Sequence, residues 1–252
     1  GTPTATGTFP FQLKVTDANN ATSTVALSIT INPQKACLLN GQFAQVEVGY
    51  ASGRPFVAAG SYSVDTNGAV SGYQDQSGAA VVAETVTGTC TTRTTNNGTL
   101  TVTGATRSPT YDYATTIALD KGRSQLMNGG DKIASSAQFH KQDATAFNGA
   151  ALAGEWSFGA LGSYMPTNTI DPGTRLAVAG RFTLDAAGAV TAGRLDSNGT
   201  TPRSAAAFTG TLGATTPGTI DAHGRAKLHV ALTGVADTYD FITYVVDANH
   251  LY

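Results

Sequence analysis

The sequence predicts an all-β protein in which one pair of strands precedes two antiparallel meander units, each a small barrel or sandwich. Three observations favour this class. Glycine is abundant, with 29 residues, and only 13% of residues are charged, which is typical of short strands joined by tight turns. Short runs of alternating apolar and polar residues recur along the chain. From residue 38 to the end, the sequence holds two copies of one pattern.

The first strand pair is predicted in residues 1–32. Apolar Phe11, Leu13 and Val15 alternate with polar residues, and a second alternating run follows the turn-forming stretch Asp-Ala-Asn-Asn at 17–20. An isolated hairpin is at best marginally stable in water. We therefore expect these two strands to pack on something else.

Residues 7–31 read GTFPFQLKVTDANNATSTVALSITI. This pattern of strand, Asp-Ala-Asn turn and strand resembles the last two strands of the immunoglobulin-like modules that occur in tandem in large bacterial surface proteins. The resemblance implies that residues 1–35 are the C-terminal strands of an immunoglobulin-like module, followed by a linker. The front of that module would then come from a longer polypeptide or from another subunit.

Two copies of one repeat are predicted over residues 36–142 and 143–252. Four matches occur in the same order, and they are 39–43 with 152–156, 59–70 with 179–190, 87–89 with 209–211 and 110–113 with 238–241. Successive hairpins of this kind form a meander, which hides its edges best in a barrel or a sandwich. The second copy stops earlier than the first, so we expect its closing strand to be missing.

The paired repeat resembles an uncharacterised repeat of long secreted proteins from soil bacteria, and this resemblance implies no activity. The two cysteines, Cys37 and Cys90, both lie in the first copy. An even pair in a Thr- and Gly-rich β protein favours one disulfide, although two buried free thiols are the alternative. A disulfide closing a loop of this length contributes about 4 kcal/mol. These features predict a secreted or cell-surface protein.

Several classes of partner are not expected. The net charge is −2 and the basic residues are scattered singly, so the sequence offers no surface for nucleic acid. No apolar run approaches the roughly 20 residues of a membrane-spanning helix, so membrane insertion is not expected. The G-x-S-x-G elbow of serine hydrolases and the glycine-rich loops of nucleotide-binding proteins are both lacking. We predict no enzyme and no cofactor.

The titratable residues do not form a metal-binding pattern, so no metal is predicted. The four histidines are dispersed, at His140, His223, His229 and His250. Most aspartates stand at turns beside Gly, Asn or Ala, where a side chain hydrogen-bonds nearby backbone, and none has calcium-loop spacing. A glycosidase needs two facing carboxylates, and the only glutamates are Glu47, Glu84 and Glu155. Glu47 and Glu155 lie in strands that should alternate in and out, so one of them could point inward, although most such residues face solvent.

Aromatic residues are the remaining candidates for ligand contacts. Three pairs recur at matching positions in both copies, which favours a shared core over a ligand site: Phe43 with Trp156, Tyr62 with Phe182 and Tyr113 with Phe241. Tyr50, Tyr73 and Tyr164 lack a clear counterpart. These three tyrosines are therefore the candidate surface residues for stacking on sugar rings.

Together these features favour a non-catalytic extracellular structural or adhesive protein. One form of it is a surface-filament subunit that assembles by β-strand addition, with copies of itself or neighbouring modules of a longer chain as partners. A carbohydrate-binding module of a secreted enzyme, with glycans as partners, is the alternative. A carrier that holds a small molecule inside a barrel is a third hypothesis.

Overall fold

The computed structural model describes residues 5, 7–31, 37–51, 54–77, 82–128, 133–164, 174–199 and 201–252. The predicted all-β class is confirmed, because every sheet is antiparallel and the described helical structure is one short 3-10 turn, η1 (Ala144–Ala146). The chain divides into two compact units, residues 1–36 and 37–252. Each unit is described by itself below.

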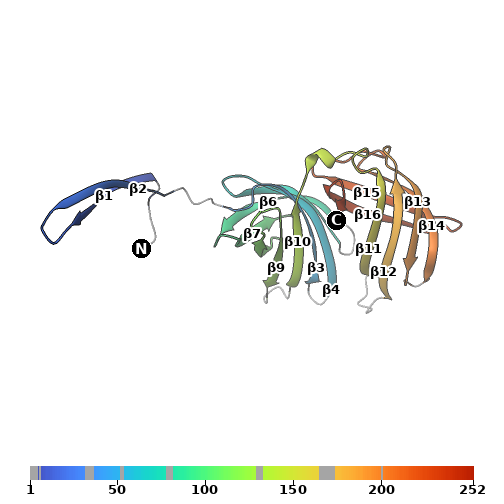
Figure 1. The fold of residues 1–252 in the computed structure, drawn as a ribbon. Coiled ribbons are helices and arrows are strands. Elements are labelled where there is room, and N and C mark those ends of the chain that lie inside the picture. Colours follow the sequence, from blue (N-terminus) through green and yellow to red (C-terminus); the bar gives the residue numbers. More distant parts are fainter. Residues whose placement is uncertain are drawn as a thin grey trace. The chain divides into compact units, whose positions relative to one another are not determined.

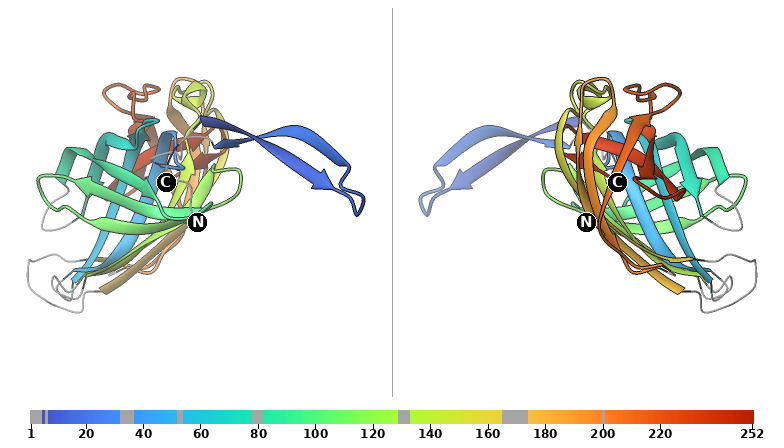
Figure 2. Two further views of the ribbon diagram at one scale, coloured as in Figure 1. Left: turned by 90° about the vertical axis from the view of Figure 1, so that its left-hand side faces the viewer. Right: turned by 90° about the vertical axis from the view of Figure 1, so that its right-hand side faces the viewer.

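The first unit is a single hairpin of β1 (Gly7–Thr16) and β2 (Thr22–Ile31), visible as a twisted ribbon in dark blue (Figure 2). Its ten cross-strand pairs run without a bulge from Gly7 opposite Ile31 to Thr16 opposite Thr22. At the turn, Asp17 Oδ1 accepts hydrogen bonds from the backbone N–H groups two and four residues later, both 2.8 Å long. The predicted turn chemistry is therefore present.

The second unit begins with a closed antiparallel barrel of eight strands, in the order β10-β3-β4-β5-β6-β7-β8-β9 (Figure 1). Its strands are β3 (Gly41–Ala51), β4 (Arg54–Val64), β5 (Ala69–Gln76), β6 (Val82–Thr92), β7 (Asn97–Thr103), β8 (Thr110–Thr115), β9 (Lys121–Asn128) and β10 (Ile133–Lys141). Strand β10 pairs with both β3 and β9. This double pairing closes the ring and leaves no free edge.

A curled sheet of seven strands follows, in chain order (Figure 1). Its strands are β11 (Gly154–Tyr164), β12 (Thr174–Leu184), β13 (Ala189–Ser197), β14 (Arg203–Gly213), β15 (Arg225–Leu232), β16 (Thr238–Asp247) and β17 (His250–Leu251). In the described part of the chain, β11 pairs only with β12, and β17 pairs only with β16. This second sheet is therefore open, and we call it the open sheet.

The barrel and the open sheet follow the same local plan. Phe43 stands opposite Tyr62 in the barrel, and the matching Trp156 stands opposite Phe182 in the open sheet. The turns after β4 and β12 both begin with an aspartate whose Oδ1 accepts from the N–H groups two and four residues later. The matched sequence segments thus occupy matched places in the two sheets.

Each region encloses its own apolar core. The barrel core contains, among others, Cys37, Leu39, Phe43, Val64, Cys90, Leu100, Val102, Tyr113 and Phe139. The core of the open sheet contains Leu152, Phe182, Leu184, Leu195, Phe208, Leu212, Leu228 and Val230. Six members of the recurring aromatic pairs lie in or against these cores, as the sequence predicts.

Candidate functional site

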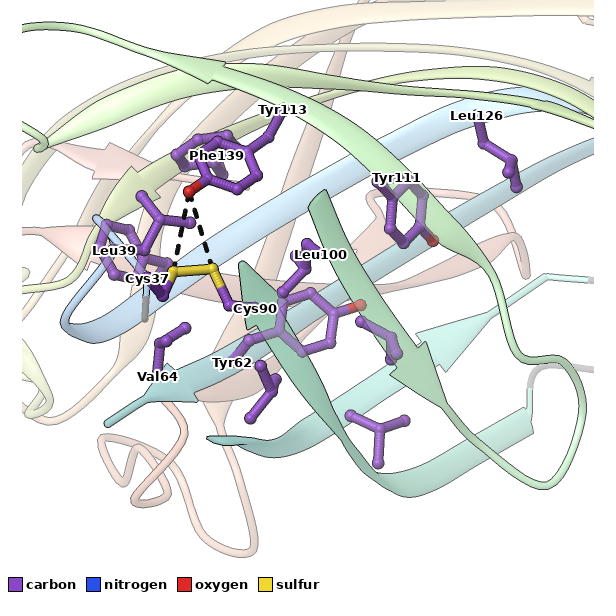
Figure 3. Close-up of a cluster of buried hydrophobic side chains, with 14 residues drawn as sticks. Cys37, Leu39, Tyr62, Val64, Cys90, Leu100, Tyr111, Tyr113, Leu126 and Phe139 are labelled. Atoms are coloured by element: carbon purple, nitrogen blue, oxygen red, sulfur yellow. Dashed lines mark hydrogen bonds between the residues drawn. A yellow bond between two sulfur atoms is a disulfide. The ribbon is translucent and has the colours of Figure 1, made fainter. Parts of the chain in front are cut away.

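The predicted disulfide is present between Cys37 and Cys90, whose Cα atoms are 5.3 Å apart (Figure 3). Both residues are 2% exposed, and the Tyr113 hydroxyl lies 3.7 Å from each sulfur atom. The bond connects the segment that enters the barrel to β6, across 53 residues of sequence. It is a buried structural bond rather than a reactive one, because solvent does not reach the sulfur atoms.

The three candidate tyrosines lie in different surroundings. Tyr50, near the end of β3, is 60% exposed and lines an open groove of about 890 Å³ together with Leu161 of β11. Tyr73, on β5, is half-buried and stacks on His223, with 5.6 Å between ring centres. Tyr164 is the last residue of β11, and its side chain lies outside the described part of the structure. Of the two tyrosines whose side chains are described, Tyr50 has the open aromatic surface that a sugar needs.

A buried polar network lies inside the barrel, and sequence reasoning did not find it. Glu47 is only 1% exposed, and it accepts hydrogen bonds from Arg107, from the Tyr111 hydroxyl at 2.8 Å and from Ser135. Strands β3, β8 and β10 and the connection between β7 and β8 thus meet at one carboxylate. Because Glu47 has the same strand parity as Phe43, its inward direction follows from alternation.

A second branch of the network runs from Tyr62 through Gln74 to Glu84. The Tyr62 hydroxyl donates to Gln74 at 2.9 Å, Gln74 donates to Glu84 at 2.7 Å, and the backbone N–H of Thr106 also donates to Glu84. Burial by itself would raise the pKa of Glu84, but these hydrogen bonds outweigh it and lower that pKa. Glu84 is therefore held as a carboxylate.

The network is arranged as a structural ion pair. Burial and the nearby Glu47 charge raise the pKa of Tyr111, so its hydroxyl stays protonated and donates. Burial alone would lower the pKa of Arg107, but the bond to Glu47 raises it. Both oxygens of Glu47 are already occupied by donors, which leaves no free lone pair directed at a substrate.

A second cluster of charged and aromatic groups joins the barrel to the open sheet. Arg225 of β15 donates two hydrogen bonds, of 2.6 and 2.7 Å, to Asp75 on the outward face of β5. The Tyr244 hydroxyl donates to the same carboxylate at 2.6 Å. Asp75 is 5% exposed, and its bond raises the pKa of Arg225. We call this contact the junction.

Apolar and backbone contacts extend the junction. Ala44 packs against Tyr244 and Val246, and all three are buried. Gln142 donates to the carbonyl oxygen of Val245 at 2.5 Å and accepts from Ser61 at 2.7 Å. The junction therefore has the burial and hydrogen bonding of a fixed interface.

An aromatic cluster lies beside the junction, where β10 meets the last residues of the chain. His140 lies 4.7 Å from His250 between ring centres, and its Nδ1 contacts the Tyr252 hydroxyl. Burial, followed by the charges of His250 and Lys121, lowers the pKa of His140. The neutral form of this imidazole is therefore favoured in the folded protein at neutral pH.

The hairpin has one apolar face that is exposed to solvent. The pairs Phe9 with Ile29, Phe11 with Leu27 and Leu13 with Val25 stand directly opposite each other, so these side chains share one face. Each of them is between 43% and 54% exposed. Such a contiguous apolar surface is typical of an interaction site.

The edges of the open sheet are lined by aromatic residues. Trp156 and Phe158 on β11, and Tyr239 and Phe241 on β16, are only partly buried against the core. The rings of Phe158 and Phe241 approach to 6.1 Å between centres across the opening. The interior of the open sheet is therefore covered incompletely between β11 and β16.

The comparisons with known proteins add no relative to this description. No family model, curated protein or solved structure matches the chain. Among the described residues, no three His, Cys, Asp or Glu side chains lie close enough to hold a metal ion. None of the described helical segments has the length and apolar character to span a membrane.

Proposed function

We propose that this chain is a non-catalytic structural or adhesive protein of the cell exterior, and that copies of it associate by β-strand addition. The observation that carries the proposal is the open sheet, whose β11 edge is unpaired within the described residues. Unpaired backbone N–H and C=O groups on such an edge can bond to a strand from another chain.

The closed barrel indicates what a completing strand looks like. Strand β10 has nine residues and directs Ile133, Ala137 and Phe139 toward the barrel interior. In the described part of the open sheet, no strand takes the place of β10. A strand of similar length with one apolar face would therefore complete it.

The hairpin meets both requirements. Strands β1 and β2 have ten residues each, and their shared apolar face is exposed. The hairpin of one copy, placed on the β11 edge of a second copy, would bury this face against Trp156 and Phe158. Burial of apolar area and new backbone hydrogen bonds would both favour this contact.

An extracellular location is supported by the disulfide. Disulfides form and persist in oxidising compartments and are rare in the reducing cytosol. The bond is buried and spans 53 residues, so it is a built-in part of the barrel rather than a transient link.

The association can be tested with two variants on one strand of the hairpin. Phe11→Lys places a charge on the apolar face, whereas Gln12→Lys places it on the opposite face. Light scattering after size-exclusion chromatography is expected to show concentration-dependent oligomers for the natural chain and for Gln12→Lys, and monomers for Phe11→Lys. A natural chain that stays monomeric at high concentration would contradict the proposal.

A glycan-binding role is the second candidate, and it rests on Tyr50. This ring is 60% exposed beside the groove that it shares with Leu161. Binding on a glycan array that disappears in Tyr50→Ala but persists in Tyr73→Ala would support this role, because Tyr73 is already engaged by His223. An array without any bound glycan would exclude it for the glycans tested.

A further inference from the structure

We infer that the outward face of strands β11–β13 holds a binding site for an oxyanion, such as a carboxylate or sulfate group carried on a sugar. The first observation is a pocket of about 670 Å³ on this face. Arg181 and Arg194 both line it, from neighbouring strands. The chemistry of the site follows from this pair.

The two arginines stand directly opposite each other in the register of β12 and β13. Like charges at directly opposite positions destabilise a sheet. Both side chains are exposed, and neither forms an ion pair with a described residue. An anion bound between them would relieve this repulsion, and each planar guanidinium can donate two parallel hydrogen bonds to it.

The rest of the pocket suits a hydroxylated ligand. Five residues with hydroxyl groups also line it: Ser157, Thr183, Thr191, Thr209 and Thr233. These groups can both donate and accept hydrogen bonds, as the hydroxyls of a sugar require. Glu155 is the one carboxylate that lines the pocket, and it should disfavour an anion at its own end.

The internal repeat supplies a second observation. Ser157, Arg181 and Arg194 form one cross-strand row, and the same row in the barrel is Ala44, Ser61 and Tyr73. In the barrel this row is part of the junction, where each of its residues contacts the open sheet or the connection to it.

In the open sheet, the equivalent surface has no such cover among the described residues. Two of its three positions carry arginine in place of Ser61 and Tyr73. The row is thus a contact surface in both sheets. In the barrel its residues suit a protein contact, whereas in the open sheet they suit an anion.

Isothermal titration with three probes tests the inference: sodium sulfate, a uronic acid disaccharide and the corresponding neutral disaccharide. Both anions are expected to bind and the neutral sugar is not. Arg181→Gln and Arg194→Gln should each weaken binding by about tenfold or more. Glu155→Gln should strengthen it. Arg203→Gln, which removes an arginine outside the pocket that pairs with Asp237, is the matched control and should change nothing.

The outcomes separate the sources of the anion. Tighter binding of the acidic disaccharide than of sulfate assigns the site to an acidic glycan, whereas equal binding assigns it to the free oxyanion, and both support the inference. Binding that survives in the Arg181→Gln/Arg194→Gln double variant overturns it. Arginine-dependent self-association without binding of either anion also overturns it, in favour of a protein partner. Circular dichroism of each variant checks that the fold is retained.

Discussion

Inside the barrel, Gln45, Glu47, Gln74 and Glu84 direct polar side chains into a shared interior. Strand register identifies the equivalent positions of the open sheet, and these are occupied by Phe158, Ala160, Leu195 and Ala206. Leu212 of the open sheet occupies the position equivalent to Cys90 of the disulfide. The closed form of the repeat thus holds a polar network beside its apolar core, whereas the equivalent positions of the open form are apolar.

The difference teaches that ring closure determines whether polar side chains can be buried with all their hydrogen-bond partners. Glu47 is satisfied because Arg107, Tyr111 of β8 and Ser135 of β10 all donate to it. A buried carboxylate without such partners is strongly destabilising. The open sheet has no described counterpart of β10, and its interior residues need no hydrogen-bond partner. The open edge instead leaves a row of aromatic side chains partly exposed at the opening.

Removal of the disulfide should produce the largest difference in stability between the barrel and the open sheet. The Cys37→Ala/Cys90→Ala variant is expected to lose about 4 kcal/mol in the free energy of unfolding of the barrel, because the unfolded loop is no longer constrained. Trp156, the single tryptophan, reports on the open sheet by fluorescence, while circular dichroism reports on both regions. If only the barrel is destabilised, the urea midpoint measured by circular dichroism should fall below the midpoint measured by Trp156 fluorescence. Transitions that shift together would show one cooperative unit.

Glu47→Gln should cost about 3 kcal/mol, because it leaves the Arg107 charge buried without its carboxylate. The matched control is Glu155→Gln on the exposed face of β11, which should change stability by less than about 0.5 kcal/mol. Urea denaturation followed by circular dichroism measures both variants. A loss in Glu47→Gln as small as in the control would mean that the network is not sealed from water.

The junction should contribute less, because Arg225 is 21% exposed. Asp75→Asn removes the carboxylate that Arg225 and Tyr244 share, and we expect a loss of about 2 kcal/mol. Asp196→Asn changes the register-equivalent aspartate of the open sheet, which is exposed, and serves as the control. Calorimetry should show the barrel and open-sheet transitions moving apart in Asp75→Asn only.

The smallest effect is expected from pH. The folded-state pKa of His140 is lowered, whereas the unfolded value is about 6.5, so the unfolded chain binds more protons as the pH falls through this range. The stability contribution is therefore present above about pH 6.5 and is lost as the solution becomes more acidic. Melting temperatures at neutral pH and at about pH 5.5 should differ less in His140→Asn than in the natural chain. The control is His229→Gln, which changes a half-buried histidine that pairs with Asp240 and is not in contact with His140.

Much of the fold could be predicted from the residues themselves. Period-two alternation located the strands, the Asp-x-x-Gly stretches located turns such as the one at Asp65, and the cysteine pair indicated the disulfide. Strand alternation and turn residues are local features, and the disulfide follows from the number of cysteines, so one sequence is enough to predict them.

The interior network and the junction could not be predicted in the same way. Strand alternation leaves open which of Glu47 and Glu155 points inward, and in the structure it is Glu47, which has the same parity as Phe43. Asp75 and Arg225 are 150 residues apart, and only the packing of the open sheet on the barrel brings them together. Partners that depend on ring closure or on docking leave no periodic signal in the chain.

The Cys37–Cys90 bond also has a mechanical consequence. A pulling force transmitted along the chain from the hairpin reaches the second unit at Cys37, and from there the covalent bond carries it directly to β6. The 53 residues that the bond spans would extend to about 180 Å if they unravelled. With the bond intact, the covalent path of this load bypasses strands β3 to β5. Tension along the chain would therefore stretch other segments, while the bond limits the extension of this part of the barrel.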